Sequence, residues 1–188
     1  VTFGNAFVEA EFAQEFGDTV AGATTTDYEG TALYVHGGTK MNNLTIGGMA
    51  WYLSGDSDGT GDDEAFGQAG NDFNPLLIAT GDDYGLLNQQ GGNNIFAAQA
   101  GQIAVGVYAS IPVSDKLTLT SVIGAAWADE EKAGGVLPNQ TEDEYGYEID
   151  IKADYKLLDN LTYSVNFGYF DIGDYVEQAV GATNFKQD

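Results

Sequence analysis

The sequence contains no cysteine and no arginine, and it has only one histidine and three prolines. The absence of cysteine excludes disulfides and thiolate metal sites. Six lysines stand against 29 acidic residues, and the resulting formal charge of −23 disfavours nucleic acid and anionic headgroups as partners. The chain has no run of 18 apolar residues, so it offers no candidate transmembrane helix.

Apolar and polar residues alternate in many segments instead. In YGYEIDIKADYKL (145–157), the odd positions from Tyr147 to Leu157 are apolar and the even positions between them are ionisable. This period of two predicts a β-strand with one apolar and one charged face. Similar alternation occurs in residues 6–16, 31–40, 44–54, 102–113, 117–127 and 161–170. The 43% hydrophobic content argues against an acidic disordered chain, and we expect an all-β protein with seven strands.

Short and long connections alternate between these strands. Residues 42–43, 114–116 and 159–160 are tight links of turn-forming residues, whereas 17–30, 55–95 and 129–144 are long and polar. Short periplasmic turns and long extracellular loops are typical of outer-membrane barrels. Strands of roughly 10 to 13 residues also match the 9–11 residues that a tilted transmembrane strand needs. The pattern predicts a transmembrane antiparallel up-and-down β-barrel, of which this chain supplies about seven strands.

The apolar face of these strands has aromatic ends and an aliphatic middle. Tyr145, Tyr147 and Tyr155 flank aliphatic residues, and Trp127 ends its strand before a long connection. Such aromatic girdles mark the two interfaces of a membrane. We expect outward side chains at Tyr147, Ile149, Ile151, Val165, Phe167, Val105, Val107 and Ile123. We expect a pore lined by Glu9, Glu11, Glu15, Glu148, Asp150, Lys152, Asp154 and Lys156, which predicts a preference for cations.

Three phrases of the chain resemble the C-terminal half of bacterial outer-membrane porins, including alginate-export-like ones. They are GTALYVHGGTKMNNLTIGGMAWYLSGDSDGTGDDE, FNPLLIATGDDY and YGYEIDIKADYKLLDNLTYSVNFGYF. The resemblance implies passive diffusion of small hydrophilic solutes or cations through a homotrimer, in contact with outer-membrane lipid and lipopolysaccharide of Gram-negative bacteria.

The strand count and the last residues depart from that family. Seven strands is an odd number, and the chain stops at NFKQD rather than at a strand with a terminal aromatic residue. We therefore interpret residues 1–188 as one barrel domain that lacks N-terminal strands and a last C-terminal strand. A signal peptide would have been lost with the N-terminal part.

The long connection 55–95 carries two further predictions. Its GDSDGTGDDE segment spaces Asp56, Asp58 and Asp62 like calcium ligands, but the twelfth position from Asp56 is Gly67 rather than an acid. Calcium is the only cofactor suggested, and a solvated acidic loop is the favoured interpretation. A connection of this length, with its own apolar FNPLLIA segment, is expected to pack inside the barrel or over its mouth and narrow the pore. Its candidate constriction residues are Asp72, Asp82 and Asp83.

One alternative to a channel remains open, and it is not an enzyme. His36 is the only histidine and no serine motif accompanies it, so we expect no enzyme. A soluble or surface-displayed acidic β-sandwich, such as an adhesin or a lectin-like module, would need the same alternation. The alternating connection lengths and the aromatic strand ends favour the channel.

Overall fold

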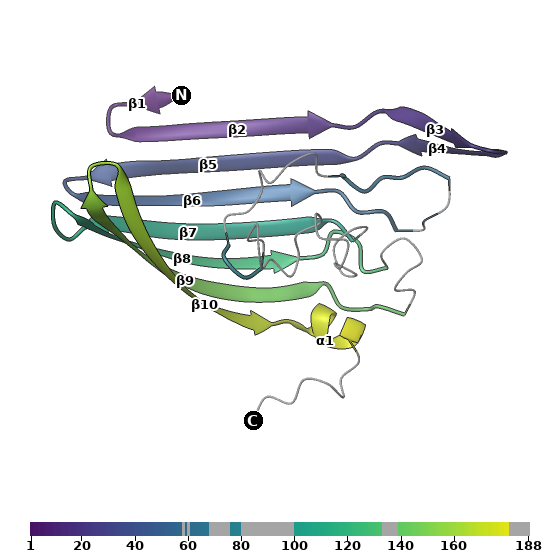
Figure 1. Cartoon of the computed structure of the whole chain (residues 1–188). Helices are drawn as coiled ribbons and strands as arrows, with labels where there is room; N and C mark the ends of the chain where they lie inside the picture. The colour runs from purple at the N-terminus through teal and green to yellow at the C-terminus, as the bar shows by residue number, and fades with distance from the viewer. Residues whose placement is uncertain (58, 60, 68–75, 80–99, 133–138, 181–188) are drawn as a thin grey trace.

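The computed structural model describes residues 1–57, 59, 61–67, 76–79, 100–132 and 139–180. Its single helix among these residues is α1 (Asp174–Val180). Its strands are β1 (Thr2–Phe3), β2 (Ala6–Gln14), β3 (Gly17–Ala21), β4 (Thr24–Tyr28), β5 (Thr31–Met41), β6 (Leu44–Leu53), β7 (Gln102–Pro112), β8 (Leu117–Trp127), β9 (Glu144–Leu158) and β10 (Leu161–Ile172) (Figure 1).

Eight of these strands form one antiparallel sheet in the order β1-β2-β5-β6-β7-β8-β9-β10. Strands that are neighbours in the sheet follow one another along the chain, apart from the excursion through β3 and β4. All short turns therefore lie at one end of the sheet and all long connections at the other (Figure 1). The prediction of an all-β protein is confirmed, and the seven predicted strands are β2 and β5 to β10.

The structure adds elements that alternation did not indicate. Residues 17–30, predicted as a plain connection, contain β3 and β4, which pair as a two-stranded sheet around a turn at Gly22 with a φ of 67°. Each of these strands has only five residues and a threonine-rich or mixed sequence, so neither shows the apolar face by which alternation identifies a strand. The two-residue β1 pairs with β2 and makes the main sheet eight-stranded rather than seven-stranded.

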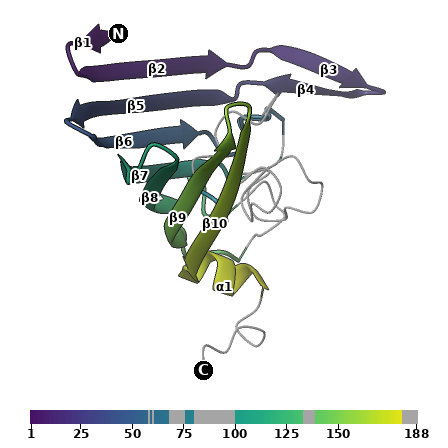
Figure 2. The same ribbon diagram turned by 60° about the vertical axis from the view of Figure 1, so that its left-hand side comes forward.

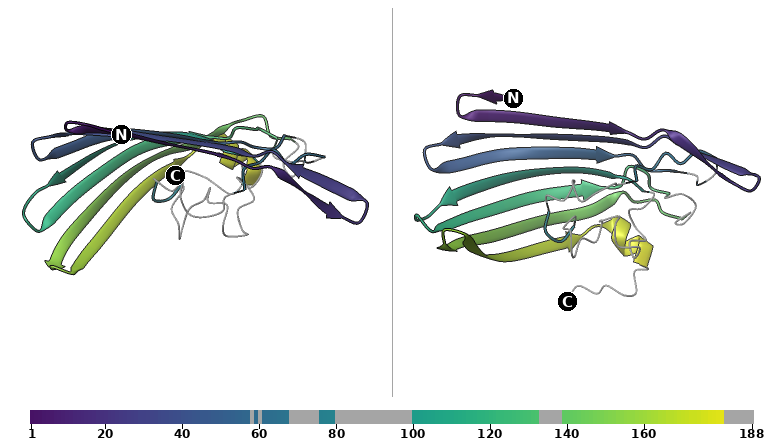
Figure 3. Two further views of the ribbon diagram at one scale, coloured as in Figure 1. Left: turned by 90° about the horizontal axis from the view of Figure 1, so that it is seen from above. Right: turned by 45° about the horizontal axis from the view of Figure 1, so that its top comes forward.

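The main sheet is curved and, within the described residues, open (Figures 2 and 3). Its edges are β1 and β10, each of which has one neighbour in the sheet. Residues 76–79 lie over one face, which we call the inner face, and the opposite face is called the outer face (Figure 2). The closed barrel expected from the sequence is thus not formed by the described strands alone.

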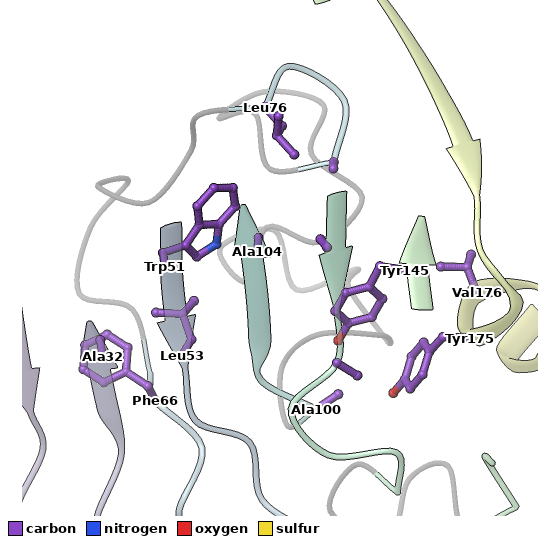
Figure 4. Packing of buried hydrophobic residues seen from close by; sticks show 13 residues of the cluster. Ala32, Trp51, Leu53, Phe66, Leu76, Ala100, Ala104, Tyr145, Tyr175 and Val176 are labelled. Atoms are coloured by element: carbon purple, nitrogen blue, oxygen red, sulfur yellow. The ribbon is translucent and has the colours of Figure 1, made fainter. Parts of the chain in front are cut away.

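The hydrophobic core lies on the inner face, near the end with the long connections (Figure 4). Trp51 and Leu53 of β6 and Ala104 of β7 pack there beneath residues such as Phe66 and Leu76 of the 54–101 connection. Farther along the sheet, the rings of Tyr145 and Tyr175 meet edge to face with centroids 4.9 Å apart (Figure 4). The core therefore joins the sheet to its own long connections rather than to a second sheet.

Tyr145 corrects one detail of the predicted apolar face. We expected its side chain beside that of Tyr147 on the outer face, but Tyr145 is fully buried in the core. The cause is a bulge: Ala126 pairs with Gly146 and Trp127 with Glu144, which leaves Tyr145 as an extra residue. An extra residue reverses the side-chain parity beyond it, and Gly146 permits the turn of the backbone with a φ of 132°.

Candidate functional site

The register of the sheet brings most of the predicted polar residues to the inner face. One row of paired residues crosses the sheet through Glu9, His36, Met49, Gly106, Gly124, Glu148 and Phe170. The next row runs through Phe7, Gly38, Gly47, Tyr108, Val122, Asp150 and Gly168. Acidic side chains therefore lie toward both margins of this face, and small residues lie between them.

Glu148 and Asp150 are covered by residues 76–79. The backbone N–H groups of Ile78 and Ala79 donate to the two oxygens of Glu148, each at 2.6 Å. The N–H of Leu77 donates to Oδ2 of Asp150 at 3.1 Å. Glu148 is 0% exposed and Asp150 is 7% exposed. The prediction that both acids line a water-filled lumen is therefore corrected: they lie on the expected face, but they hold the connection above them.

Glycines on the flanking strands make room for this segment. A Cβ atom at Gly124 of β8 would lie 2.7 Å from Cδ2 of Leu76, and one at Gly168 of β10 would lie 2.9 Å from Cδ1 of Ile78. Real Cβ atoms do not approach other atoms this closely, so larger residues would displace the segment. The two glycines and the two acids thus form one seat for residues 76–79.

Glu15 holds the same connection at the opposite margin of the sheet. Its Oε2 accepts a hydrogen bond from the N–H of Gly67 at 3.1 Å. Gly30 lies beneath this contact, where an added Cβ would be 2.6 Å from both Oε2 of Glu15 and Cα of Phe66. A third predicted pore-lining acid is therefore an anchor of the 54–101 connection.

Glu9 belongs to a hydrogen-bonded chain of three side chains on the inner face. Oε1 of Glu9 lies 2.7 Å from Nδ1 of His36, and Nε2 of His36 lies 3.0 Å from the hydroxyl of Tyr108. Tyr108 can reach His36 because it lies across glycines, with Cε1 2.5 Å from where a Cβ at Gly47 would be. Each ring nitrogen has one partner, which fixes the imidazole, and Glu9 itself stays well exposed.

Of the remaining predicted pore-lining residues, Glu11, Lys152 and Lys156 are exposed and Asp154 is half-buried. Lys152 pairs with Asp154 at 3.2 Å, and Ser164 donates to the other oxygen of Asp154 at 2.5 Å. Lys156 pairs with Asp159 in the adjoining turn at 3.2 Å. Glu11 is exposed opposite Tyr34 of β5. Both lysines of β9 are thus neutralised locally, and neither of them pairs with the exposed acids Glu9 and Glu11 of the inner face.

Further acids gather where the long connections begin. Oδ2 of Asp129 accepts hydrogen bonds from the hydroxyl of Tyr52 and the N–H of Gly55, each at 3.0 Å. Desolvation and the charges of Asp129 and Glu64 raise the pKa of Glu130 above its usual range. Negative charge is therefore concentrated at this end of the sheet.

The predicted calcium ligands are only partly described. Asp56 is buried and accepts a hydrogen bond from the N–H of Gly59 at 3.1 Å, and Asp62 is exposed. Asp58 lies outside the described residues, as do the predicted constriction residues Asp72, Asp82 and Asp83. Within the described part of the chain, no group of three or more acidic, histidine or cysteine side chains could hold a metal ion. The calcium site therefore stays a prediction.

The outer face carries the apolar side chains and nothing described covers it. Val107 is 60% exposed, Ile123 is 52% exposed and Phe167 is 64% exposed, although β7 and β8 lie inside the sheet. All the side chains predicted to point outward are exposed: Tyr147, Ile149, Ile151, Val165, Phe167, Val105, Val107 and Ile123. They extend over four neighbouring strands, β7 to β10, as one apolar surface.

Sequence reasoning missed Tyr108 and the glycines that surround it. The only available signal was the number of glycines inside predicted strands, because such glycines mark places where another group approaches the backbone closely. Gly47, Gly124 and Gly168 are such positions, and each has a side chain against it. Glycines on the polar side of a strand are thus the sequence signal that could have indicated side chains packed on this face.

Comparison with family models, curated proteins and solved structures finds no match to this chain. Among the described residues, no helix is long and apolar enough to cross a membrane.

Proposed function

We propose that the chain forms part of the wall of an outer-membrane channel, a porin-like β-barrel through which small hydrophilic solutes diffuse passively. The observation that carries this proposal is the uncovered apolar outer face, which lies opposite a polar inner face. Exposed apolar patches larger than a few hundred Å² are rare on soluble monomers and mark contact with other proteins or with membranes. Here, eight exposed large apolar side chains lie on four neighbouring strands, so they form a patch rather than isolated exposed residues.

The dimensions and the connections of the sheet support a membrane as the medium of the outer face. Strands β5 to β10 contain between 10 and 15 residues each. A tilted strand needs about 9–11 residues to cross the hydrocarbon layer. The segregation of tight turns to one end and long connections to the other is the arrangement of outer-membrane barrels.

The acidic sandwich is less well supported. In a sandwich, the apolar face of one sheet packs on the apolar face of another. Within the described residues, the packing elements lie on the polar inner face, and the separate sheet of β3 and β4 extends from one end of the main sheet (Figure 1). A soluble fold would leave the apolar face in water.

Closure of the barrel, lipid contact and assembly are parts of the same proposal. The open edges at β1 and β10 would pair with further strands, because unpaired backbone groups are not tolerated in hydrocarbon. The partners would be outer-membrane lipid, lipopolysaccharide and two further copies in a homotrimer. The channel would prefer cations, chiefly through Glu9, Glu11 and the acids near the long connections.

Purification and conductance measurements test the proposal. We expect the protein to require detergent, to migrate differently in gels before and after heating, and to produce stepwise conductance in planar bilayers. The same preparation heated to unfolding should produce none. A protein that stays monodisperse without detergent and gives no conductance would overturn the proposal in favour of a soluble β-protein.

A further inference from the structure

The acids Glu148 and Asp150 form a buried pair with little around them to balance two charges. They are two residues apart on β9, project from the same face and lie within hydrogen-bonding range of each other. Two ionised carboxylates so placed in a dry site repel each other strongly. Residues 76–79 nevertheless cover these two acids. Something must therefore reduce the repulsion between the carboxylates.

No charged side chain among the described neighbours offsets the repulsion between Glu148 and Asp150. The flanking residues Val122 and Gly124 of β8, and Gly168 and Phe170 of β10, are uncharged. The covering residues 76–79 are Leu, Leu, Ile and Ala. Along β9 the next ionisable side chain on this face is Lys152, whose ammonium pairs with Asp154. Among the described ion pairs, none includes Glu148 or Asp150.

One oxygen of the pair lacks a partner. Three of the four carboxylate oxygens accept a backbone N–H from residues 77–79. The fourth, Oδ1 of Asp150, is buried and makes no hydrogen bond among the described residues. An unsatisfied buried polar atom costs roughly 1–3 kcal/mol, so its presence in a well-seated contact requires an explanation.

We propose that Glu148 and Asp150 bind one proton between them, carried on Oδ1 of Asp150 and donated to the carboxylate of Glu148. This places a donor on the only oxygen that lacks a partner. Glu148 keeps its charge and accepts this proton's hydrogen bond as well as those of Ile78 and Ala79. The pair then carries one negative charge instead of two, and the shared proton helps to hold residues 76–79 on the inner face. The inference does not depend on whether the sheet closes into a channel.

The assignment predicts different results for the two conservative amide substitutions. In Asp150→Asn, the amide oxygen accepts from Leu77 and the NH₂ group donates to Glu148, which reproduces the protonated pair permanently. In Glu148→Gln, the NH₂ group must face the N–H of Ile78 or Ala79, and one hydrogen bond is lost. Asp154→Asn is the matched control, because Asp154 lies on the same face of β9 but outside the seat.

Hydrogen exchange of the amides of residues 77–79 tests these expectations. Protection is measured from acidic to alkaline pH in detergent and corrected at each pH with the unfolded peptide. In the wild type, protection should fall at least about tenfold as the proton is lost, which corresponds to about 1.4 kcal/mol. Asp150→Asn should stay protected throughout, Glu148→Gln should be less protected at every pH, and Asp154→Asn should follow the wild type.

Protection of Asp150→Asn that falls with pH like the wild type, or that is lower than wild type at acidic pH, would overturn the proposal. Wild-type protection that is constant with pH but rises with added sodium or calcium would assign the pair to a metal cation and would also overturn it. Infrared spectroscopy of the unmodified protein provides a second test that needs no variant. A carboxylic acid band should persist at neutral pH, where ordinary acids are ionised, and its absence would contradict the shared proton.

Discussion

The two faces of the eight-stranded sheet are made by alternate residues of the same strands, yet they differ in what covers them. On the outer face, the apolar side chains of β7 to β10 are exposed, including Val107 and Phe167. On the inner face, polar and small residues are buried under the 54–101 connection, including the acidic Glu148. This is the reverse of a soluble sheet, in which the apolar face is covered and the polar face meets water.

The comparison shows that hydrophobicity alone does not determine which parts of this sheet are covered. Residues 76–79 pack where carboxylates accept their N–H groups and where Gly124 and Gly168 leave space for their side chains. The outer face has abundant apolar surface but no described segment packs on it. The proposal that lipid surrounds the outer face rests on this exposed apolar surface.

The largest expected effect comes from placing an arginine on one face of the sheet or on the other. Ile151→Arg puts an arginine in the middle of the outer face and should destabilise the folded protein in lipid by ~2–4 kcal/mol. Asn166→Arg, on the inner face of the adjacent strand, should cost much less, because its side chain can stay in water. Urea unfolding in lipid vesicles measures both. Equal losses would mean that the faces are not in different media.

A smaller loss is expected from filling the inner seat. Gly124→Ala brings a methyl group against Leu76 and should destabilise the protein by ~1–3 kcal/mol, as overpacking does. Gly48→Ala is the matched control on the outer face, where the nearest atom to the added Cβ would be 3.4 Å away. Unfolding midpoints of the two variants compare them. A neutral Gly124→Ala would indicate that residues 76–79 do not need this seat.

The ion preference of the channel should depend on exposed acids and not on covered ones. Replacing Glu9 and Glu11 by glutamine should reduce cation preference, whereas Asp150→Asn should leave it unchanged. The reduction should be clearest at low salt, because the Debye length is about 10 Å at 0.1 M and about 3 Å at 1 M. Reversal potentials across a KCl gradient measure the effect. An equal shift from Asp150→Asn would show that the covered pair faces the ion path.

The smallest effect concerns Glu130 near the long connections. Its pKa is raised in the folded protein, mainly by desolvation and then by Asp129. Folding therefore favours the protonated form of Glu130. Its contribution to stability is present below the pKa that Glu130 has in the unfolded chain and is lost as the pH rises through its raised pKa in the folded protein. Glu130→Gln should stabilise the protein at neutral pH but not at acidic pH, as measured by urea unfolding. The exposed Glu142→Gln is the control, and identical behaviour of both variants would contradict this.

Alternation predicted the strands and their faces because it is a direct consequence of backbone geometry. It assigned Glu148 to the inner face but could not show that residues 76–79 cover this acid, because periodicity contains no information about contacts distant in sequence. It misplaced Tyr145, since a one-residue bulge at Gly146 has no period of its own. The hairpin of β3 and β4 escaped prediction because five residues are too few to establish a pattern.

Fluorescence quenching in lipid vesicles tests the central claim most directly, because the chain has no native cysteine. The variants Ile151→Cys and Asn166→Cys would each carry one environment-sensitive label, on the outer and the inner face respectively. The proposed orientation predicts that quenchers on lipid chains act on the label at position 151, and that water-soluble quenchers act on the label at position 166. Equal access of a water-soluble quencher to both labels in folded protein would contradict the proposal that the outer face lies in a membrane.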